Sequence, residues 1–170
     1  MLNLLFMATK NKNLSIYDPR NIPSGSGKKI GIVVSEWNSE ITNGLKDGAL
    51  ETLTSCGVYS RDIYIEQVPG AFELPLGAKL LIEEKLVDAV ITIGCVIRGE
   101  TAHFDYVCQG VTQGIQALNL STGKPVMFCV LTDDKLKQSK ERSGGKHGNK
   151  GVEAAIGALK MLNLSDRLKK

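Results

Sequence analysis

The sequence predicts an α/β protein, a three-layer sandwich in which a four-stranded parallel sheet is flanked by helices on both faces. Three observations support this prediction. Short apolar runs rich in β-branched residues recur along the chain, segments with helical periodicity separate them, and 170 residues suffice for one domain with its own core. Because parallel strands must be joined by crossovers, regular alternation of strand and helix favours such a sheet.

The first half of the chain contributes two strands and two helices. "KIGIVV" (29–34) is a short β-branched run, and "RDIYIEQV" (61–68) alternates apolar and polar residues as a strand does. Residues 39–55 carry an apolar residue at every fourth position from Ile41 to Leu53, which predicts an amphipathic helix. Residues 71–85 return to helical periodicity after a Pro-Gly break, with Pro75 in the first turns, where proline is tolerated.

The second half repeats this alternation. "DAVITIGCVI" (88–97) is continuously apolar, which is typical of a parallel strand buried on both faces, and "PVMFCVLT" (125–132) is the fourth strand. Helical periodicity predicts one helix over 102–118 and another over 149–162, with a short charged helix over 133–143 between them. The complete order of elements predicts a flavodoxin-like sheet.

The chain divides into an arm and one domain. Residues 1–28 are predicted to be an N-terminal arm, partly flexible, because 8–28 are polar and rich in Asn, Pro, Ser and Gly. Residues 29–170 form the domain. The apolar start "MLNLLFMATK" is too short for a membrane span and lacks the basic residues that open a signal peptide.

Composition excludes several classes of function. A net charge of +3 is small, and 5% aromatic residues leave few platforms for stacking bases, so nucleic acid is not an expected partner. The four cysteines form no C-x-x-C pair and the chain has two histidines, which argues against a metal site. This cysteine usage favours a reducing cytoplasm.

Ligand sites in parallel sheets lie beyond the carboxyl ends of the strands. This rule selects "SEWNSE" (35–40), "VPGAFE" (68–73), "CVIRGETAH" (95–103) and "FCVLTDD" (128–134). The segment 95–103 has two interpretations. Gly99, Glu100 and Thr101 lead into a helix whose amide groups suit phosphate, or they form a plain capping turn. His103 in the first helical turn either transfers protons or only caps and packs.

Other polar and aromatic residues at these ends also leave alternatives open. Trp37 could stack on a flat heterocycle or cover the rim of the core. Glu73 could accept hydrogen bonds from sugar hydroxyls or act as a cap. Phe128 lies inside a strand, where core packing is the default expectation. "KERSGGKHGNKG" (140–151) could bind phosphate through Arg142 or serve as a flexible hinge between two helices.

Taken together, these segments resemble the 6,7-dimethyl-8-ribityllumazine synthase family of riboflavin biosynthesis. The resemblance runs from about Lys29 to Leu164 and rests on an ordered set of motifs: "GIVVSEWNSEIT", "VPGAFELP", "GCVIRGETAHFDYV", "PVMFCVLT" and "ERSGGKHGNKGVEAA". It implies the condensation of 5-amino-6-(D-ribitylamino)uracil with 3,4-dihydroxy-2-butanone 4-phosphate. Phosphate and water are released in this penultimate step of the pathway, and no metal or other cofactor is needed.

The resemblance also implies roles for individual residues. His103 matches the proton-transfer residue of the family, and Lys150 a lysine close to its site. Glu100, Thr101 and Arg142 match positions that hold the butanone phosphate. The positions that hold the aminouracil are Trp37, Ala71, Phe72, Glu73, Cys95, Val96, Ile97 and Phe128. Two residues near the expected phosphate depart from the family's pattern. Glu100 places an acid beside the phosphate, and His147 stands where smaller residues are usual.

The resemblance further implies a homopentamer with sites shared between subunits, Phe128 and the Arg142 region coming from one and the remaining loops from its neighbour. The short turn in "SGGKHGNKG" favours an icosahedral capsid of sixty subunits. Riboflavin synthase is a further candidate partner, and no membrane partner is expected. Two alternatives remain: a flavodoxin-like module that binds a flavin or nucleotide without catalysis, and a catalytically inactive shell-forming relative.

Overall fold

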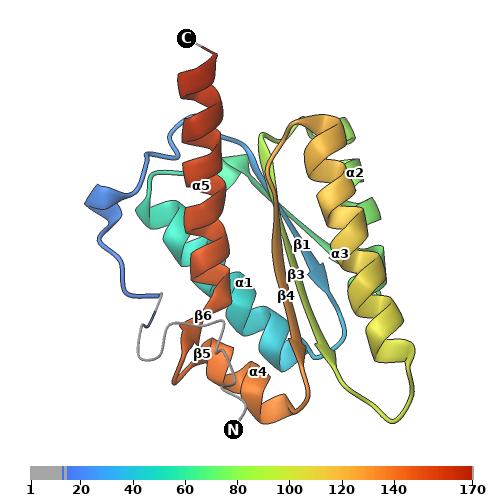
Figure 1. Ribbon diagram of the computed structural model, residues 1–170. Coiled ribbons are helices and arrows are strands. Elements are labelled where there is room, and N and C mark those ends of the chain that lie inside the picture. Colours follow the sequence, from blue (N-terminus) through green and yellow to red (C-terminus); the bar gives the residue numbers. More distant parts are fainter. Residues whose placement is uncertain (1–12, 14, 170) are drawn as a thin grey trace, which may run out of the picture.

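The computed structural model describes Asn13 and residues 15–169, and it confirms the predicted fold class. Four parallel strands form the sheet in the order β2-β1-β3-β4. Their bounds are β1 Ile30–Ser35, β2 Ile63–Val68, β3 Ala89–Ile97 and β4 Val126–Asp133. Helices α1 (Ser39–Ser55) and α5 (Lys150–Leu168) cover one face, and α2 (Leu74–Glu84) and α3 (His103–Thr122) cover the other (Figure 1).

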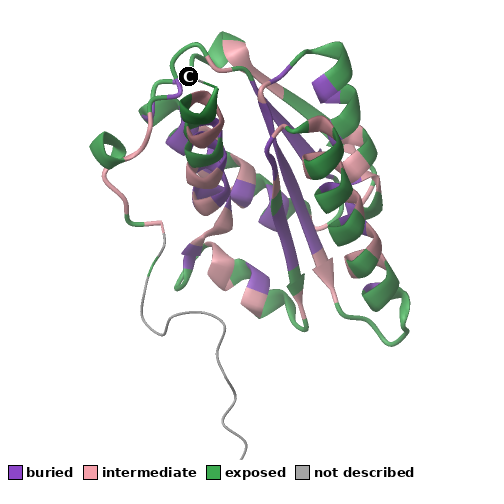
Figure 2. Cartoon of the chain, turned by 45° about the horizontal axis from the view of Figure 1, so that its top comes forward, coloured by how far each residue is buried: buried purple, intermediate pink, exposed green. Residues whose placement is uncertain are grey.

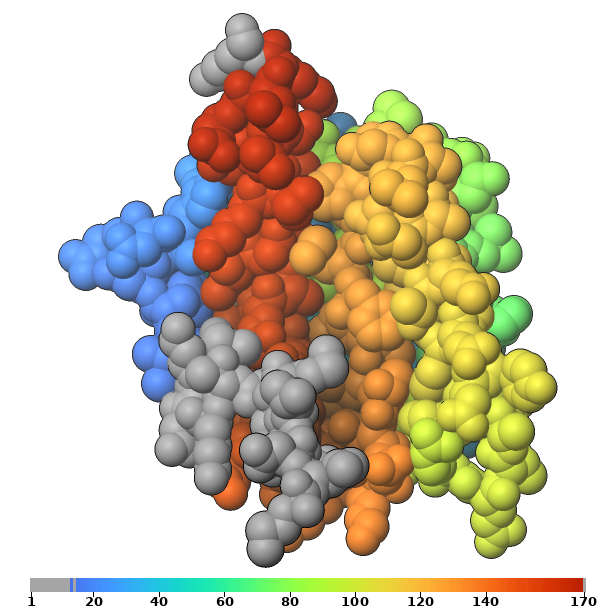
Figure 3. All heavy atoms as spheres, in the orientation of Figure 1, coloured from blue at the N-terminus to red at the C-terminus, as the bar shows by residue number. Residues whose placement is uncertain are grey.

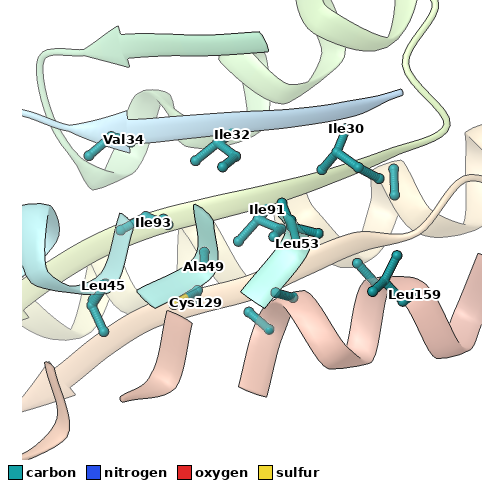
Figure 4. Close-up of a cluster of buried hydrophobic side chains, with 14 of the residues drawn as sticks. Ile30, Ile32, Val34, Leu45, Ala49, Leu53, Ile91, Ile93, Cys129 and Leu159 are labelled. Atoms are coloured by element: carbon teal, nitrogen blue, oxygen red, sulfur yellow. The ribbon is translucent and has the colours of Figure 1, made fainter. Parts of the chain in front are cut away.

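Two hydrophobic clusters lie on opposite faces of the sheet because successive strand residues point to opposite sides. Ile32 and Ile91 pack with α1 and α5, and Figure 4 shows this cluster, whereas Val33 and Val90 pack with α2 and α3. In Figure 2 the central strands are almost wholly buried, while the outer surfaces of the helices are exposed. The sheet therefore provides a rigid floor whose carboxyl edge carries the loops selected from the sequence.

Close packing of α1 against α5 requires glycine at one position. A Cβ atom at Gly151, in the first turn of α5, would collide with the backbone carbonyl of Leu45 in α1. The adjacent Asn149 caps α5 by accepting a hydrogen bond from the Gly151 amide at 2.8 Å, and its side chain donates to the Gly44 carbonyl at 2.8 Å. The helix is thereby fixed at its start, beside Lys150.

Several helix ends differ from their predicted positions. The third large helix was expected to end at residue 118, but α3 continues to Thr122, where Gly123 with φ 64° ends it. The last helix was expected to end at residue 162, but α5 continues to Leu168. A 3-10 helix, Ala71–Glu73, precedes α2, and the charged helix α4 spans Leu136–Arg142.

The Gly-rich segment is not an open hinge. Its backbone forms an antiparallel hairpin from β5 (Ser143–Gly145) and β6 (Gly148–Asn149). Gly144 and Gly148 have φ values of 122° and 87°, which only glycine adopts without strain. The glycines therefore serve a defined turn that joins α4 to α5.

The predicted N-terminal arm falls partly outside the described residues, which lack 1–12 and 14. The part from residue 15 onward includes a 3-10 helix, Pro19–Asn21, and contacts the domain at several points, among them Asn149, which bonds Ser15. The Gly25 amide donates to the Cys56 carbonyl at 2.8 Å, and Lys28 pairs with Asp166 at 2.7 Å.

Another 3-10 helix, Ser60–Asp62, leads into β2. Across Asn13 and 15–169, none of the helices has both the length and the apolarity to span a bilayer.

Candidate active site

A pocket of about 690 Å³ opens at the carboxyl ends of β1 and β3, where the sequence located ligand binding. Its walls come from the loop after β1, the 3-10 helix before α2, the end of β3 and the first turns of α3. Eight of the predicted site residues line it: Trp37, Ala71, Phe72, Glu73, Cys95, Val96, Ile97 and His103. Residues from four separate segments thus share one cavity, although their individual roles remain predictions.

The loop after β1 is held in place by Asn38. This residue has a left-handed backbone (φ 58°), which is uncommon outside glycine but tolerated by asparagine. Its side-chain amide donates to the Cys95 carbonyl at 2.9 Å, and its own carbonyl accepts from the Ile41 amide at 2.9 Å. The neighbouring Trp37 is 73% exposed at the pocket, so its indole is open for stacking rather than covering the core.

Sequence reasoning missed Asn38 as a pocket residue, together with Tyr106 and Val107. The signal for Asn38 was its place between a strand and a helix, where asparagine readily adopts the left-handed conformation. Tyr106 lies one turn after His103, so helical spacing could have brought it to the same side.

Phe72 extends from the 3-10 helix toward α3. A Cβ atom at Gly110 of α3 would come within 2.7 Å of the Phe72 ring, so glycine makes room for it. The ring remains largely exposed, and the adjacent Glu73 is half-buried in the pocket wall. An apolar surface and a carboxylate therefore lie side by side at this wall.

The end of β3 offers backbone groups rather than a reactive thiol. Cys95 is buried, and its Sγ donates to the Ser139 hydroxyl at 3.4 Å. Burial raises the pKa of the Cys95 thiol. A thiol that stays protonated is a poor nucleophile.

His103 is exposed and begins α3, at the edge of the pocket. The hydroxyl of Thr101 accepts from the His103 amide at 3.4 Å. Glu100 and Thr101 are exposed in the loop just before this helix but do not line the pocket. Asp105 pairs with Arg98 at 3.1 Å.

A second pocket, of about 350 Å³, lies at β4 and is lined by Phe128, Lys150 and Glu153 among others. The default expectation that Phe128 packs in the core is wrong, because β4 is an edge strand and the ring is 43% exposed. Lys150 donates to the Glu153 carboxylate at 2.7 Å. Figure 3 shows the surface of β4 between α3 and α5. Phe128 and Lys150 therefore do not join the first pocket within one chain.

Arg142 lines neither pocket. It ends α4, is half-buried, and donates to the Gln138 carbonyl of its own helix at 2.9 Å. The only buried residue of this helix is Ser139, whose hydroxyl donates to the Asp133 carboxylate at 2.8 Å. Ser139 thus connects the helix that carries Arg142 to the ends of β3 and β4, a role that the sequence did not suggest.

Within the described part of the chain, His, Cys, Asp and Glu side chains form no cluster of three or more that could hold a metal ion. The polar side chains that line the first pocket include the His103 imidazole, the Glu73 carboxylate, the Asn38 amide and the Tyr106 phenol.

Comparison with known proteins gives a consistent result. Residues 27–166 match the family model described as 6,7-dimethyl-8-ribityllumazine synthase. A protein of that name from Flavobacterium johnsoniae is 60% identical over 155 residues, which cover 91% of this chain and 82% of the relative. The one from Flavobacterium psychrophilum is 56% identical over 161 residues, covering 95% and 85%. The one from Parabacteroides distasonis is 55% identical over 159 residues, covering 94% and 99%.

Proposed function

Because this chain belongs to the 6,7-dimethyl-8-ribityllumazine synthase family, we propose that it condenses 5-amino-6-(D-ribitylamino)uracil with 3,4-dihydroxy-2-butanone 4-phosphate. The products are 6,7-dimethyl-8-ribityllumazine, phosphate and water, in the penultimate step of riboflavin synthesis. The observation that carries this proposal is the pocket at the carboxyl ends of β1 and β3, which unites Trp37, Glu73 and His103.

The first pocket suits the aminouracil. A planar pyrimidinedione can stack on the open indole of Trp37, and its polar edge can bond the backbone of Cys95, Val96 and Ile97. The ribityl chain carries hydroxyl groups, for which Glu73 supplies acceptors at the same wall. In this assignment the flat ring and the polyol occupy adjacent parts of one cavity.

The phosphate of the second substrate is assigned to the start of α3. The N-terminus of a helix presents unpaired amide groups and a partial positive charge, both of which favour an anion. Glu100 and Thr101 lie directly before this terminus, and the exposed Glu100 carboxylate can remain in solvent while its amide contributes. Arg142 would add a guanidinium, which pairs well with phosphate oxygens.

In the proposed reaction the amine attacks the ketone carbonyl and water leaves as a Schiff base forms. Phosphate then departs by elimination, and the ribitylamino nitrogen closes the ring on the remaining carbonyl with loss of a second water, which gives the lumazine. His103 transfers protons during these steps, a contribution that is typically about 10²- to 10⁴-fold in rate. Holding the two substrates in register supplies much of the remainder. The transformation involves no net oxidation or reduction, so the proposal includes no redox cofactor.

The proposal extends to a homopentamer in which neighbouring subunits complete each site. Phe128 and Lys150 lie in a pocket of their own, apart from Trp37 and His103, and a neighbour could bring the two pockets together. Exposed apolar residues of the same chain, Phe72, Leu76 and Leu80, recur every four residues over the start of α2 and offer a surface for subunit contact. The short β5–β6 turn is compatible with further assembly into a sixty-subunit capsid, which light scattering would detect.

The proposed location is the cytoplasm. Cys56, Cys95, Cys108 and Cys129 are all free thiols, and proteins of reducing compartments keep their cysteines in this state.

The test is an assay with both substrates, monitored by the fluorescence of the lumazine product. We expect product from the wild-type chain and single-turnover rates lowered by about 10²- to 10⁴-fold in His103→Ala. Gln113→Ala, an exposed change on the same helix and outside the pocket, is the matched control. A purified protein that holds a flavin or nucleotide but forms no product would instead support a binding module.

A further inference from the structure

Arg98 is the cation nearest in sequence to the predicted phosphate loop, yet it lines neither pocket. It follows β3 directly, and its guanidinium contacts two carboxylates. Its Nε donates to Asp134 at 2.9 Å, and its Nη1 donates to the two oxygens of Asp105 at 3.1 and 3.3 Å. The guanidinium carbon also lies 4.1 Å from the centre of the Phe104 ring.

These contacts join three segments that carry predicted site residues. Phe104 is buried and directly follows His103, and Asp105 lies in the same first turn of α3. Asp134 belongs to the connection between β4 and α4, the helix that ends at Arg142. A single side chain therefore links the start of α3 with the β4–α4 connection.

The loop between Arg98 and α3 has little support of its own. Residues 99–102 are all exposed, and the hydrogen bond from the His103 amide to Thr101 is long, at 3.4 Å. A Cβ atom at Gly99 would meet no atom within 4 Å. With so few contacts, the position of the loop depends on its two ends. Arg98 is one end, and its side chain contacts the other end at Phe104 and Asp105.

The same contacts leave Arg98 poorly placed as a ligand for phosphate. Its Nε and Nη1 groups donate to two carboxylates, and one face of the guanidinium lies on the Phe104 ring. Its hydrogen bond to Asp134 and, less strongly, its hydrogen bond to Asp105 raise the pKa of Arg98. A bidentate pair with an anion would need Nε or Nη1, so the anion would have to displace Asp134 or Asp105.

We propose that Arg98 is a positioning residue. It holds residues 99–103 at a fixed position relative to the β4–α4 connection, so that the phosphate loop and His103 contact the same substrate molecule. This inference rests on the proposed condensation for its kinetic consequence. Its structural consequence, an ordered loop in the resting protein, does not depend on which reaction occurs.

The kinetic test compares Arg98→Met with Asp105→Asn/Asp134→Asn. For a loop displaced from its working position, we expect kcat/KM for the butanone phosphate to fall between about fivefold and a hundredfold in both variants. The KM for the aminouracil stays unchanged, and Arg98→Lys, which keeps the charge but loses the fork, recovers only part of the loss. Because the carboxylates act through Arg98, combining all three changes adds little to Arg98→Met alone.

Arg61→Met is the matched control. Arg61 also lies over an aromatic ring, at 4.9 Å from the centre of Tyr59, and pairs with a carboxylate, Asp62, at 3.9 Å. It stands at the opposite end of the sheet, before β2, so its replacement leaves both kinetic constants unchanged.

Two kinetic results would overturn the inference. If Asp105→Asn/Asp134→Asn lowered the KM for the butanone phosphate, Arg98 would be a phosphate ligand that these carboxylates restrain. If Arg98→Met retained wild-type constants for both substrates, Arg98 would have no role in the reaction.

Amide hydrogen exchange of the substrate-free, full-length protein separates this inference from the proposed function. We expect Arg98→Met to increase exchange in residues 99–105 while the strands keep their protection. Unchanged exchange there would overturn the positioning role. A wild-type protein that forms no lumazine but shows this increase would overturn the proposed function and leave the role of Arg98 in ordering the loop.

Discussion

The proposed sharing of each site between neighbouring subunits can be tested by combining two defective subunits. His103 lines the first pocket, whereas Arg142 lies outside it and bonds its own helix. His103→Ala removes the proton-transfer group, and Arg142→Ala removes a charged hydrogen bond worth about 1.5–3 kcal/mol. Neither variant alone can form a complete site. A pentameric ring that contains both variants can form complete sites, if His103 of one subunit faces Arg142 of the next.

The expected recovery follows from counting subunits. With both variants co-expressed in equal amounts, half of the subunits supply His103 and half supply Arg142. A complete site needs one of each in the right order, so about one quarter of the sites are wild-type in a randomly mixed ring. At butanone phosphate concentrations below KM the defective sites add little, because the loss of a positioned proton donor costs about 10²-fold or more and the loss of Arg142 about 10- to 150-fold. The mixed enzyme should therefore show about a quarter of wild-type activity, measured as lumazine fluorescence per subunit.

A second mixture provides a quantitative control. Wild-type subunits co-expressed with the double variant His103→Ala/Arg142→Ala give complete sites only between two wild-type neighbours, again about one quarter. If each chain completed its own site, this mixture would retain about one half of wild-type activity, and the first would show no recovery. That pair of results would refute the shared site.

Three further predictions concern stability and reactivity. Gly151→Ala forces a Cβ atom against the Leu45 carbonyl and should lower the free energy of unfolding in urea by about 1–3 kcal/mol. Ser139→Ala removes the hydrogen bond to the Asp133 carboxylate, with an expected loss of about 1–3 kcal/mol in the same measurement. Burial raises the pKa of Cys129 to about 12. Because a thiol with so high a pKa stays protonated at about pH 8, Cys129 should resist alkylation at that pH until the protein unfolds.

Each of these predictions has a matched control. A Cβ atom at Gly99 meets nothing within 4 Å, so Gly99→Ala should leave the unfolding midpoint unchanged. Ser121 is exposed on α3, and Ser121→Ala should likewise have no effect. Cys108 is only half-buried and should be alkylated before Cys129 in the folded protein. Equal losses in test and control variants, or rapid labelling of native Cys129, would contradict the reasoning.

Most of the fold could be predicted because the residues that are buried in the structure are those that form the apolar runs and stripes of the sequence. The apolar runs became the four strands, and the helix predicted over 39–55 was found as α1 with those bounds. The end of α3 was missed because "NLST" (119–122) is largely polar and resembles a terminus. In the structure Asn119 bonds both Ile115 and the first residue of β4, and Thr122 donates to Leu118. Those polar groups stabilise the last turn rather than end it.

Pocket residues were predicted where they lie in the segments that follow strands, and missed where their role depends on a distant partner. Trp37 and Glu73 lie in the segments after β1 and β2, so the rule for parallel sheets located them. Asn38 matters because it bonds Cys95, and Arg98 because it contacts Asp134. Periodicity carries no information about such pairs, since a local pattern does not specify which side chain the fold will bring opposite.

The environment of Phe128 could not be predicted from local sequence, because it depends on the order of the strands in the sheet. "PVMFCVLT" and "DAVITIGCVI" are both apolar runs, but β3 lies inside the sheet and β4 at its edge. An edge strand exposes side chains that a central strand would bury, and the Phe128 ring is exposed beside Lys150 as a result. The order of motifs along the chain is the same whether this ring serves its own pocket or that of a neighbour. Within one chain Phe128 and Trp37 lie in separate pockets, so Phe128 belongs to a shared site only if a neighbouring subunit brings its β4 edge to the first pocket.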